Sequence, residues 1–187
     1  LVPGGFGNRG IEGMICACRW ARENNVPYFG ICLGMQVSVI EYARSVCGLS
    51  DANSREFTRQ KKNLVIDFMP GQNDEIEKGG TMRLGAYPCH IAEGTKLYEC
   101  YGKTDISERH RHRYEYNNQF RETLEGAGLV CCGTSPDNRI VEAVERRGAR
   151  FHIGVQFHPE FKSRPNRAHP LFVGFVKAAM EVAVEED

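Results

Sequence analysis

The chain has 187 residues, of which 41% are hydrophobic, and its 24 basic side chains balance 24 acidic ones. Domains of about 100 to 200 residues are common, so we expect one domain over residues 1–187. Without a net basic field or an apolar run near the ~20 residues of a membrane span, the composition excludes a general affinity for nucleic acid or for a membrane.

Eight cysteines are distributed along the chain. They would suit a disulfide scaffold in a short secreted protein, but this chain is long and periodic and shows no signal peptide, so we expect reduced thiols in the cytoplasm. No C-x-x-C pair occurs, and the closest spacings, Cys16 with Cys18 and Cys131 with Cys132, are poor tetrahedral zinc sites. The sequence therefore predicts no metal.

The N-terminal part of the chain alternates between strands and helices. Leu1–Gly7 is typical of the end of a buried strand followed by a glycine-rich loop, so we expect the domain to be truncated before this point and to lack its first strands. Apolar spacing predicts a helix over Ile11–Ala21. A short apolar strand over Val26–Ile31 leads into a second helix after Gly34, for which Gly48 is the C-terminal stop.

The remaining elements follow a similar alternation. The polar stretch from Asp51 to Gly80 is expected to leave the main sheet, with one strand over Asn63–Phe68. Helices are predicted over Asn118–Glu125 and Leu171–Val184. Further strands are expected at Cys89–Ile91, Leu129–Cys132, Ile140–Glu145 and Phe151–Phe157. This alternation predicts an α/β domain with a mostly parallel sheet and helices on both faces.

A candidate nucleophile lies at the junction between the expected strand and the second helix. Gly30-Ile31-Cys32-Leu33-Gly34 has the small-x-nucleophile-x-small form of a nucleophile elbow, in which glycines permit a sharp turn around a strained residue. The N-terminus of the following helix carries a partial positive charge, so we expect it to favour the thiolate of Cys32. The alternative is a cysteine buried in the core.

A cysteine that cleaves an amide needs a histidine, because the leaving nitrogen must be protonated and the thioester hydrolysed. His158 is the best candidate, since Glu160 follows two residues later and the alternation of a strand end can bring both side chains to one side. The carboxylate would then orient the imidazole. Without Cys32, the same His-Pro-Glu sequence would be typical of a surface turn.

A second glycine-rich loop, Gly4-Gly5-Phe6-Gly7, follows the first strand end. Its N–H groups, together with that of Leu33, can face a developing oxyanion. The loop lacks the Lys-Ser/Thr of a phosphate-binding P-loop, so no ATP site is expected from it.

The most basic run is Arg109–Tyr114. It suits a solvated edge strand, and a metal site at His110 and His112 would lack an obvious third ligand. A selective pocket for free glutamine needs a positive partner for the α-carboxylate and an acid for the ammonium group, so we favour a substrate role for this run.

Several segments resemble the class I, triad-type glutamine amidotransferases, and within them the CTP synthase branch. The superfamily shares GICLGMQ at 30–36 and VQFHPEF at 155–161, whereas GGTMRLG at 79–85 and ERHRHRYEYN at 108–117 are specific to the branch. PGGFGNRGIEG at 3–13 and ANSREF at 52–57 also match. The resemblance spans nearly the whole chain and implies a three-layer, flavodoxin-like α/β fold.

The resemblance also implies roles for individual residues. Cys32 would be the nucleophile, His158 the acid and base, and Glu160 its orienting partner, with Gly5 and Leu33 in the oxyanion hole. The expected glutamine-binding residues are Gly5, Phe6, Leu33, Gly34, Met35, Gln36, Glu56, Arg113 and Tyr114. Possible contacts for the allosteric activator GTP are Phe6, Arg9 and Glu12.

In such enzymes the released ammonia reaches a synthetase domain, where ATP and Mg support the amination of UTP to CTP. The resemblance implies that this N-terminal domain is absent here, that the complete enzyme is a homotetramer, and that the glutaminase half needs no cofactor. Two other hypotheses remain: a hydrolase acting on another γ-glutamyl substrate, or a non-catalytic assembly module that keeps the triad only as packing.

Overall fold

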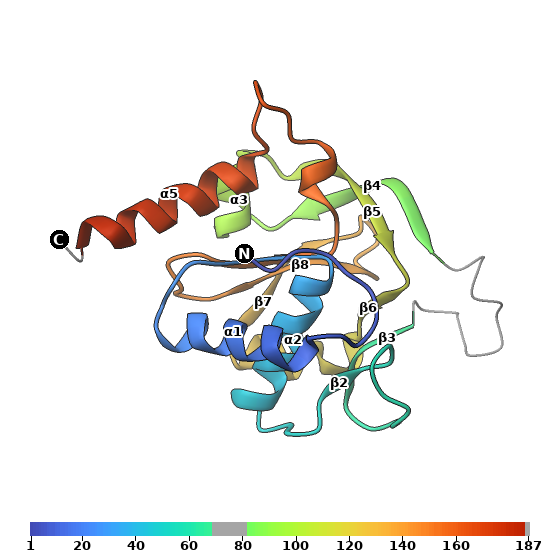
Figure 1. Ribbon diagram of the computed structural model, residues 1–187. Helices are drawn as coiled ribbons and strands as arrows, with labels where there is room; N and C mark the ends of the chain where they lie inside the picture. Colours follow the sequence, from blue (N-terminus) through green and yellow to red (C-terminus); the bar gives the residue numbers. More distant parts are fainter. Residues whose placement is uncertain (69–81, 186–187) are drawn as a thin grey trace.

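The computed structural model describes residues 1–68 and 82–185 (Figure 1). In this part of the chain, six strands form the main sheet in the order β1-β9-β8-β7-β4-β5. Three short strands form a second sheet in the order β2-β3-β6. The strands are β1 (Tyr28–Ile31), β2 (Asn53–Ser54), β3 (Leu64–Phe68), β4 (Arg83–Ile91), β5 (Asp105–His112), β6 (Tyr114–Tyr116), β7 (Leu129–Thr134), β8 (Val141–Arg146) and β9 (His152–Val155).

The main sheet is mixed, which corrects the expectation of a mostly parallel one. β1 pairs in parallel with β9, and Val2 adds a parallel bridge to Gly30. The pairs β9-β8, β8-β7, β7-β4 and β4-β5 are all antiparallel. Short turns without a crossover helix connect β7 to β8 and β8 to β9, and such turns can join only antiparallel neighbours.

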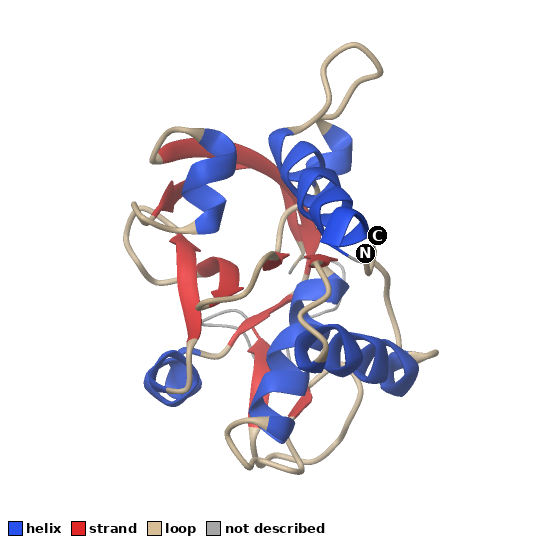
Figure 2. Ribbon diagram, turned by 90° about the vertical axis from the view of Figure 1, so that its left-hand side faces the viewer, coloured by secondary structure: helices blue, strands red, loops and turns tan. Residues whose placement is uncertain are grey.

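Helices cover both faces of this sheet, as expected for a three-layer α/β fold (Figures 1 and 2). One face carries α1 (Ile11–Glu23) and α2 (Leu33–Ser45), which pack on each other. The other face carries α3 (Lys96–Tyr101) and α5 (Pro170–Glu185), also in mutual contact. The shorter elements are α4 (Arg121–Gly126) and the 3-10 helices η1 (Asn118–Phe120) and η2 (Pro159–Phe161).

Two hydrophobic cores result from the alternation of side chains along the strands. In β1, Tyr28 contributes to the core beneath α1 and α2, whereas Phe29 contributes to the core beneath α3 and α5. Ile11 and Ile15 bury the expected face of α1 in the first core, and Leu171 anchors α5 in the second. Because β1 and β9 are parallel neighbours in this sheet, their carboxyl ends lie side by side. The candidate catalytic residues follow these two strands.

Most predicted elements are confirmed, with shifted ends. The helix expected over 118–125 is a 3-10 turn followed by α4, and the last expected strand ends at Val155 rather than at Phe157. The strand expected over 63–68 is β3, and the rest of the predicted excursion lies partly outside the described residues, as do the first residues of GGTMRLG. No helix in the described ranges is long and apolar enough to cross a membrane.

Candidate active site

The predicted elbow is present where β1 passes into α2. Cys32 has φ 50° and ψ −100°, a strained conformation for a non-glycine residue, and α2 begins at the next residue. The flanking glycines are needed because the chain is crowded on both sides: a Cβ on Gly30 would lie 2.5 Å from the carbonyl carbon of Gly34. The turn therefore holds Cys32 at the carboxyl end of β1, as the sequence predicted.

Gly34→Ala should destabilise the fold, because the new Cβ would lie 2.2 Å from the backbone oxygen of Val2. We expect a loss of about 3 kcal/mol in the free energy of unfolding, measured by urea denaturation. Gly13→Ala is the matched control, because Gly13 is an exposed residue of α1 with no atom within 4 Å of an added Cβ. This variant should increase the free energy of unfolding by about 0.5–1 kcal/mol. Equal stability of the two variants would contradict the crowding argument.

His158 and Glu160 meet beyond the end of β9, beside Cys32. Nδ1 of His158 lies 2.6 Å from Oε1 of Glu160, and the imidazole stacks on Phe161 with ring centroids 4.7 Å apart. A Cβ added to Gly4 would lie 2.8 Å from Cε1 of His158 and 3.5 Å from Cβ of Cys32, so both residues border this glycine. Nε2 of His158 is buried and has no hydrogen-bond partner among the described residues.

This geometry leaves the imidazole ready to exchange a proton through Nε2. Glu160 binds the opposite nitrogen and so fixes the orientation of the ring. The backbone N–H of His158 donates to the carbonyl oxygen of Arg109 at 2.8 Å, which ties the segment to β5. The expected grouping of Cys32, His158 and Glu160 is therefore present in the structure.

The electrostatic environment of the nucleophile differs from the expectation. Burial raises the pKa of the Cys32 thiol to about 12, and the carboxylates of Glu160 and Glu56 act in the same direction. The Leu33 N–H at the start of α2 lowers the pKa, as the helix argument predicted, but its effect is smaller than that of burial. In this state Cys32 is a thiol at neutral pH.

A cavity of about 350 Å³ opens beside Cys32. Its described lining residues are Gly5, Phe6, Cys32, Gln36, Glu56, Met82, Arg111, His112, Arg113 and Tyr114. Six of the nine residues expected to bind glutamine, all but Leu33, Gly34 and Met35, are in this set. The cavity thus collects residues from the first loop, α2, β5 and the segment after β2.

Leu33, Gly34 and Met35 do not line the cavity. Leu33 and Met35 are buried in the core, and Gly34 packs against the backbone of Val2. The side chains of Leu33 and Met35 do not line the cavity and Gly34 has none, so these residues could contribute to binding only through their backbone groups. The Cβ position of Gly5 lies 3.0 Å from Cδ2 of Leu33, which places the two expected oxyanion-hole residues next to each other.

The cavity offers both charges that a free amino acid needs. Burial raises the pKa of the Glu56 carboxyl, while the Gly7 N–H, at 2.7 Å from Oε1, and the Arg113 guanidinium lower it. Nε of Arg113 is buried without a hydrogen-bond partner in the described ranges. An acidic side chain, Glu56, and a basic one, Arg113, thus line the same cavity, and both can form further hydrogen bonds with a ligand.

Two of the three expected effector residues lie outside this cavity. Glu12 is exposed on α1 and forms an ion pair with Arg44 at 2.9 Å, and Arg9 is exposed at the preceding turn. Phe6 does line the cavity, and its ring lies 5.6 Å from the guanidinium carbon of Arg111. The GTP assignment stays a prediction.

Sequence reasoning gave Arg111 and His112 a substrate role only as part of the run Arg109–Tyr114, and it missed Gln156. Gln156 is fully buried, and its Nε2 lies 3.6 Å from Sγ of Cys32. A signal was available in the sequence: Gln156 precedes His158 by two residues and Arg111 precedes Arg113 by two, so an extended chain would place each on the same side as a predicted residue.

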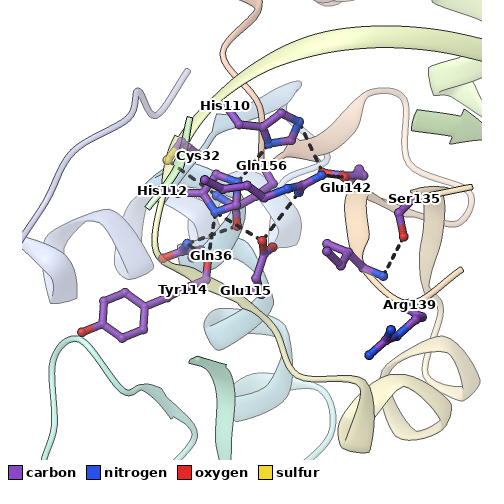
Figure 3. A network of polar contacts seen from close by, with 12 residues as sticks. Cys32, Gln36, His110, His112, Tyr114, Glu115, Ser135, Arg139, Glu142 and Gln156 are labelled. Atoms are coloured by element: carbon purple, nitrogen blue, oxygen red, sulfur yellow. Dashed lines mark hydrogen bonds and ion pairs between the residues drawn. The ribbon is translucent and has the colours of Figure 1, made fainter. Parts of the chain in front are cut away.

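Behind the cavity lies a buried polar network, shown in Figure 3. Arg83 donates to both oxygens of Glu142, at 2.6 and 3.1 Å, and its guanidinium lies 3.6 Å from Glu115. His110 and His112 contact each other at 2.9 Å, and burial lowers the pKa of His112 to about 3, so it is neutral. The edge strand expected at 109–114 therefore has one solvated face and one fully buried face.

Within the described residues, no group of three or more His, Cys, Asp or Glu side chains is arranged to hold a metal ion. All eight cysteines are free thiols.

Comparison with known proteins identifies the family. The profile described as "Glutamine amidotransferase class-I" matches residues 1–178. A curated CTP synthase from Clostridium beijerinckii is 61% identical over 97% of this chain, and one from Caldanaerobacter subterraneus is 59% identical over 98%. Each match covers 34% of the relative, so the chain spans about a third of the length of these proteins.

Solved structures give the same result. The glutaminase domain of the Trypanosoma brucei CTP synthase, described with bound acivicin, matches with a TM-score of 0.91 and 44% identity over 96% of this chain and 70% of that chain. A Thermoplasma acidophilum protein described as a GMP synthase subunit matches with a TM-score of 0.61 over 99% of this chain and 74% of that one, but at 13% identity it supports the fold alone. The chain belongs to the class-I glutamine amidotransferases, in the branch formed by the glutaminase domains of CTP synthases.

Proposed function

We propose that this chain hydrolyses L-glutamine to glutamate and ammonia through a thioester on Cys32. The observation that carries the proposal is the 2.6 Å contact between His158 and Glu160 beside a strained Cys32 that opens on a cavity of about 350 Å³. A buried core cysteine would need neither the strained turn nor an oriented histidine with a free nitrogen.

The reaction would proceed in two halves. His158 accepts the thiol proton, and the sulfur attacks the side-chain carbonyl carbon of glutamine. The tetrahedral intermediate collapses when the imidazolium gives this proton to the amide nitrogen, which leaves as ammonia. Water then attacks the thioester while His158 accepts its proton, and the return of that proton to sulfur releases glutamate. Glu160 stabilises the imidazolium in both halves.

Backbone N–H groups are the best candidates for binding the oxyanion. Leu33 is the first residue of α2, so its N–H is not used within the helix, and Gly5 lies beside it in the first loop. We assign the oxyanion hole to these two residues. Gly34 and Met35 would contribute only through their backbones.

Recognition of free glutamine is assigned to the charged ends of the cavity. Glu56 would bind the ammonium group and Arg113 the α-carboxylate, because Glu56 retains an oxygen and Arg113 a buried Nε for a ligand. Gln36, Phe6 and Tyr114 would form the remaining walls. A γ-glutamyl peptide keeps both of these α-groups and differs from glutamine only in the substituent on the amide nitrogen, so comparing the hydrolysis of glutamine with that of γ-glutamyl peptides separates the two hypotheses.

For the complete protein we propose the CTP synthase reaction. The relatives are named CTP synthases, and this chain covers only 34% of their length. Their remaining part would supply ATP and Mg binding, the amination of UTP, and the contacts of a homotetramer, with GTP as activator near Phe6, Arg9 and Glu12. Eight free thiols favour the reducing cytoplasm.

Acivicin tests this proposal, since the matched Trypanosoma brucei domain is described with it bound. We expect intact mass and peptide mapping to find one adduct, on Cys32, and excess glutamine to prevent its formation. The exposed Cys16 serves as an internal control for non-specific labelling. Labelling of Cys16 at the same rate, or labelling that glutamine does not block, would favour the assembly-module hypothesis.

A further inference from the structure

Gln156 lies outside the lining of the proposed glutamine-binding cavity and contacts both Cys32 and Gln36, which line it. It follows β9, its backbone N–H donates to the carbonyl oxygen of Glu142 at 2.8 Å, and its side chain is fully buried. The side-chain amide lies between two residues of the neighbouring elbow and helix, Cys32 and Gln36 (Figure 3). It does not line the cavity.

The hydrogen bonds of Gln36 determine whether the oxygen or the nitrogen of each side-chain amide, in Gln36 and in Gln156, faces a given neighbour. One N–H of Gln36 donates to the backbone carbonyl oxygen of Tyr114 at 3.2 Å, and the other to Oε1 of Gln156 at 3.1 Å. A backbone carbonyl can only accept, so the reversed orientation of Gln36 would set two acceptors against each other. With Gln36 so fixed, the oxygen of Gln156 must face it, and the NH₂ group of Gln156 must face sulfur.

The sulfur therefore has a donor on one side and an acceptor on the other. Nε2 of Gln156 lies 3.6 Å from Sγ, whereas the carbonyl oxygen of Arg111 lies 4.0 Å from it. The Arg111 carbonyl can accept from the thiol but would repel the thiolate. When the proton leaves for His158, the N–H groups of Gln156 and Leu33 are the neutral donors that the described surroundings of Cys32 offer to the sulfur.

The charged groups around Cys32 make such a donor important. The surrounding ionisable side chains come from three segments of the chain and are His158, Glu160, Glu56, Glu115, Arg111, His112 and Arg113. Of these, the carboxylates of Glu160, Glu56 and Glu115 oppose the thiolate, as burial does. A neutral N–H donor stabilises the thiolate without introducing a further buried charge.

We propose that Gln156 is a positioning residue for Cys32, whose amide nitrogen donates to the sulfur and stabilises the attacking thiolate, while Gln36 fixes the orientation of that amide. The role rests on the proposed function of Cys32 as the nucleophile. It also couples substrate binding to reactivity, because Gln36 lines the cavity and touches Gln156 at its back.

The test is the pH dependence of Cys32 alkylation by iodoacetamide, followed by peptide mapping and compared with the exposed Cys16 in the same sample. Gln156→Met keeps the length of the side chain but removes the donor. We expect its profile to move by about one pH unit to higher pH, which makes Cys32 about tenfold slower at pH 8. The reaction of Cys16 should not change.

Two further variants separate the parts of the proposal. Gln36→Met leaves Gln156 in place but frees it to rotate, so it should shift the alkylation profile in the same direction by less. Gln119→Met makes the same chemical change on the exposed η1 and should leave the profile unchanged. Thermal melting of each variant checks that it is folded.

The kinetic constants for glutamine add an independent readout. Gln156 does not line the cavity, so Gln156→Met should lower kcat about tenfold and leave KM essentially unchanged. An unchanged alkylation profile in folded Gln156→Met would overturn the donation, and an unchanged profile in Gln36→Met would overturn the orienting role. A shifted profile in a chain that hydrolyses no glutamine would support the positioning role and count against the proposed function.

Discussion

Cys32→Ala should reduce glutamine hydrolysis by at least about 10⁴-fold, because it removes the atom that forms the thioester. The small side chain fits the elbow, and φ 50° is no more strained for alanine than for cysteine, so the fold should persist. The measurement is glutamate release at saturating glutamine, with urea denaturation as the check on folding.

The same substitution distinguishes hydrolysis from the use of ammonia. In a complete CTP synthase chain, Cys32→Ala should retain CTP formation from free ammonia and lose only the glutamine-dependent reaction. Cys16→Ala is the control, since Cys16 is an exposed cysteine of α1 and should leave both activities intact. Loss of the ammonia-dependent reaction in Cys32→Ala would contradict the division of labour proposed here.

Arg83→Met should destabilise the domain by about 3–5 kcal/mol at pH 7, because it leaves buried carboxylates without their cation. Arg83 binds both oxygens of Glu142, which is fully buried, and contacts Glu115, which is 2% exposed. Methionine preserves much of the aliphatic stem, although it also removes the guanidinium group, whose carbon lies 4.3 Å from the centroid of the Tyr87 ring. Urea denaturation at pH 7 measures the loss.

The effect should depend on pH in a defined direction. Burial already raises the pKa of both Glu142 and Glu115 in the folded protein, and Arg83 lowers both. Without Arg83 the folded pKa values rise further, so the folded state holds more protons than the unfolded state and loses stability as pH increases above the unfolded value of about 4.3. The loss in the free energy of unfolding caused by Arg83→Met should therefore be smaller at pH 5 than at pH 7.

A surface arginine provides the control for this prediction. Arg19 forms an i,i+4 pair with Glu23 on α1, at 2.8 Å, but its side chain is 59% exposed. Arg19→Met should leave the free energy of unfolding essentially unchanged, with little dependence on pH. If Arg83→Met behaved like this surface variant, the buried network would not contribute to stability as the structure indicates.

Local sequence patterns determined the chemistry of the nucleophile and its partners. Gly30 and Gly34 around Cys32 predicted the elbow because only a residue without Cβ avoids the backbone 2.2–2.5 Å away. The spacing of His158 and Glu160 predicted their contact from the alternation of a strand end, but in the structure both residues lie beyond β9, and the 3-10 helix η2 brings Glu160 back to His158. These features depend on a few neighbouring residues, so the sequence alone could specify them.

Sheet pairing was beyond what local patterns could predict. A buried strand such as β8 has the same composition whether its neighbours run parallel or antiparallel, so alternation with helices suggested a mostly parallel sheet. The direction of each pair depends on the connection between strands, and the short turns on both sides of β8 impose antiparallel pairing.

What only the tertiary structure decided is the environment of the reacting sulfur. The sequence indicated a helix N-terminus behind Cys32, but burial by residues far along the chain has the larger effect and raises the pKa of the thiol. Gln156, directly after β9, reaches the sulfur of a residue 124 positions away in the sequence, and Arg83 reaches Glu142 across 59 residues. Desolvation and hydrogen bonds depend on distances in space, which the sheet sets by bringing the ends of β1 and β9 together.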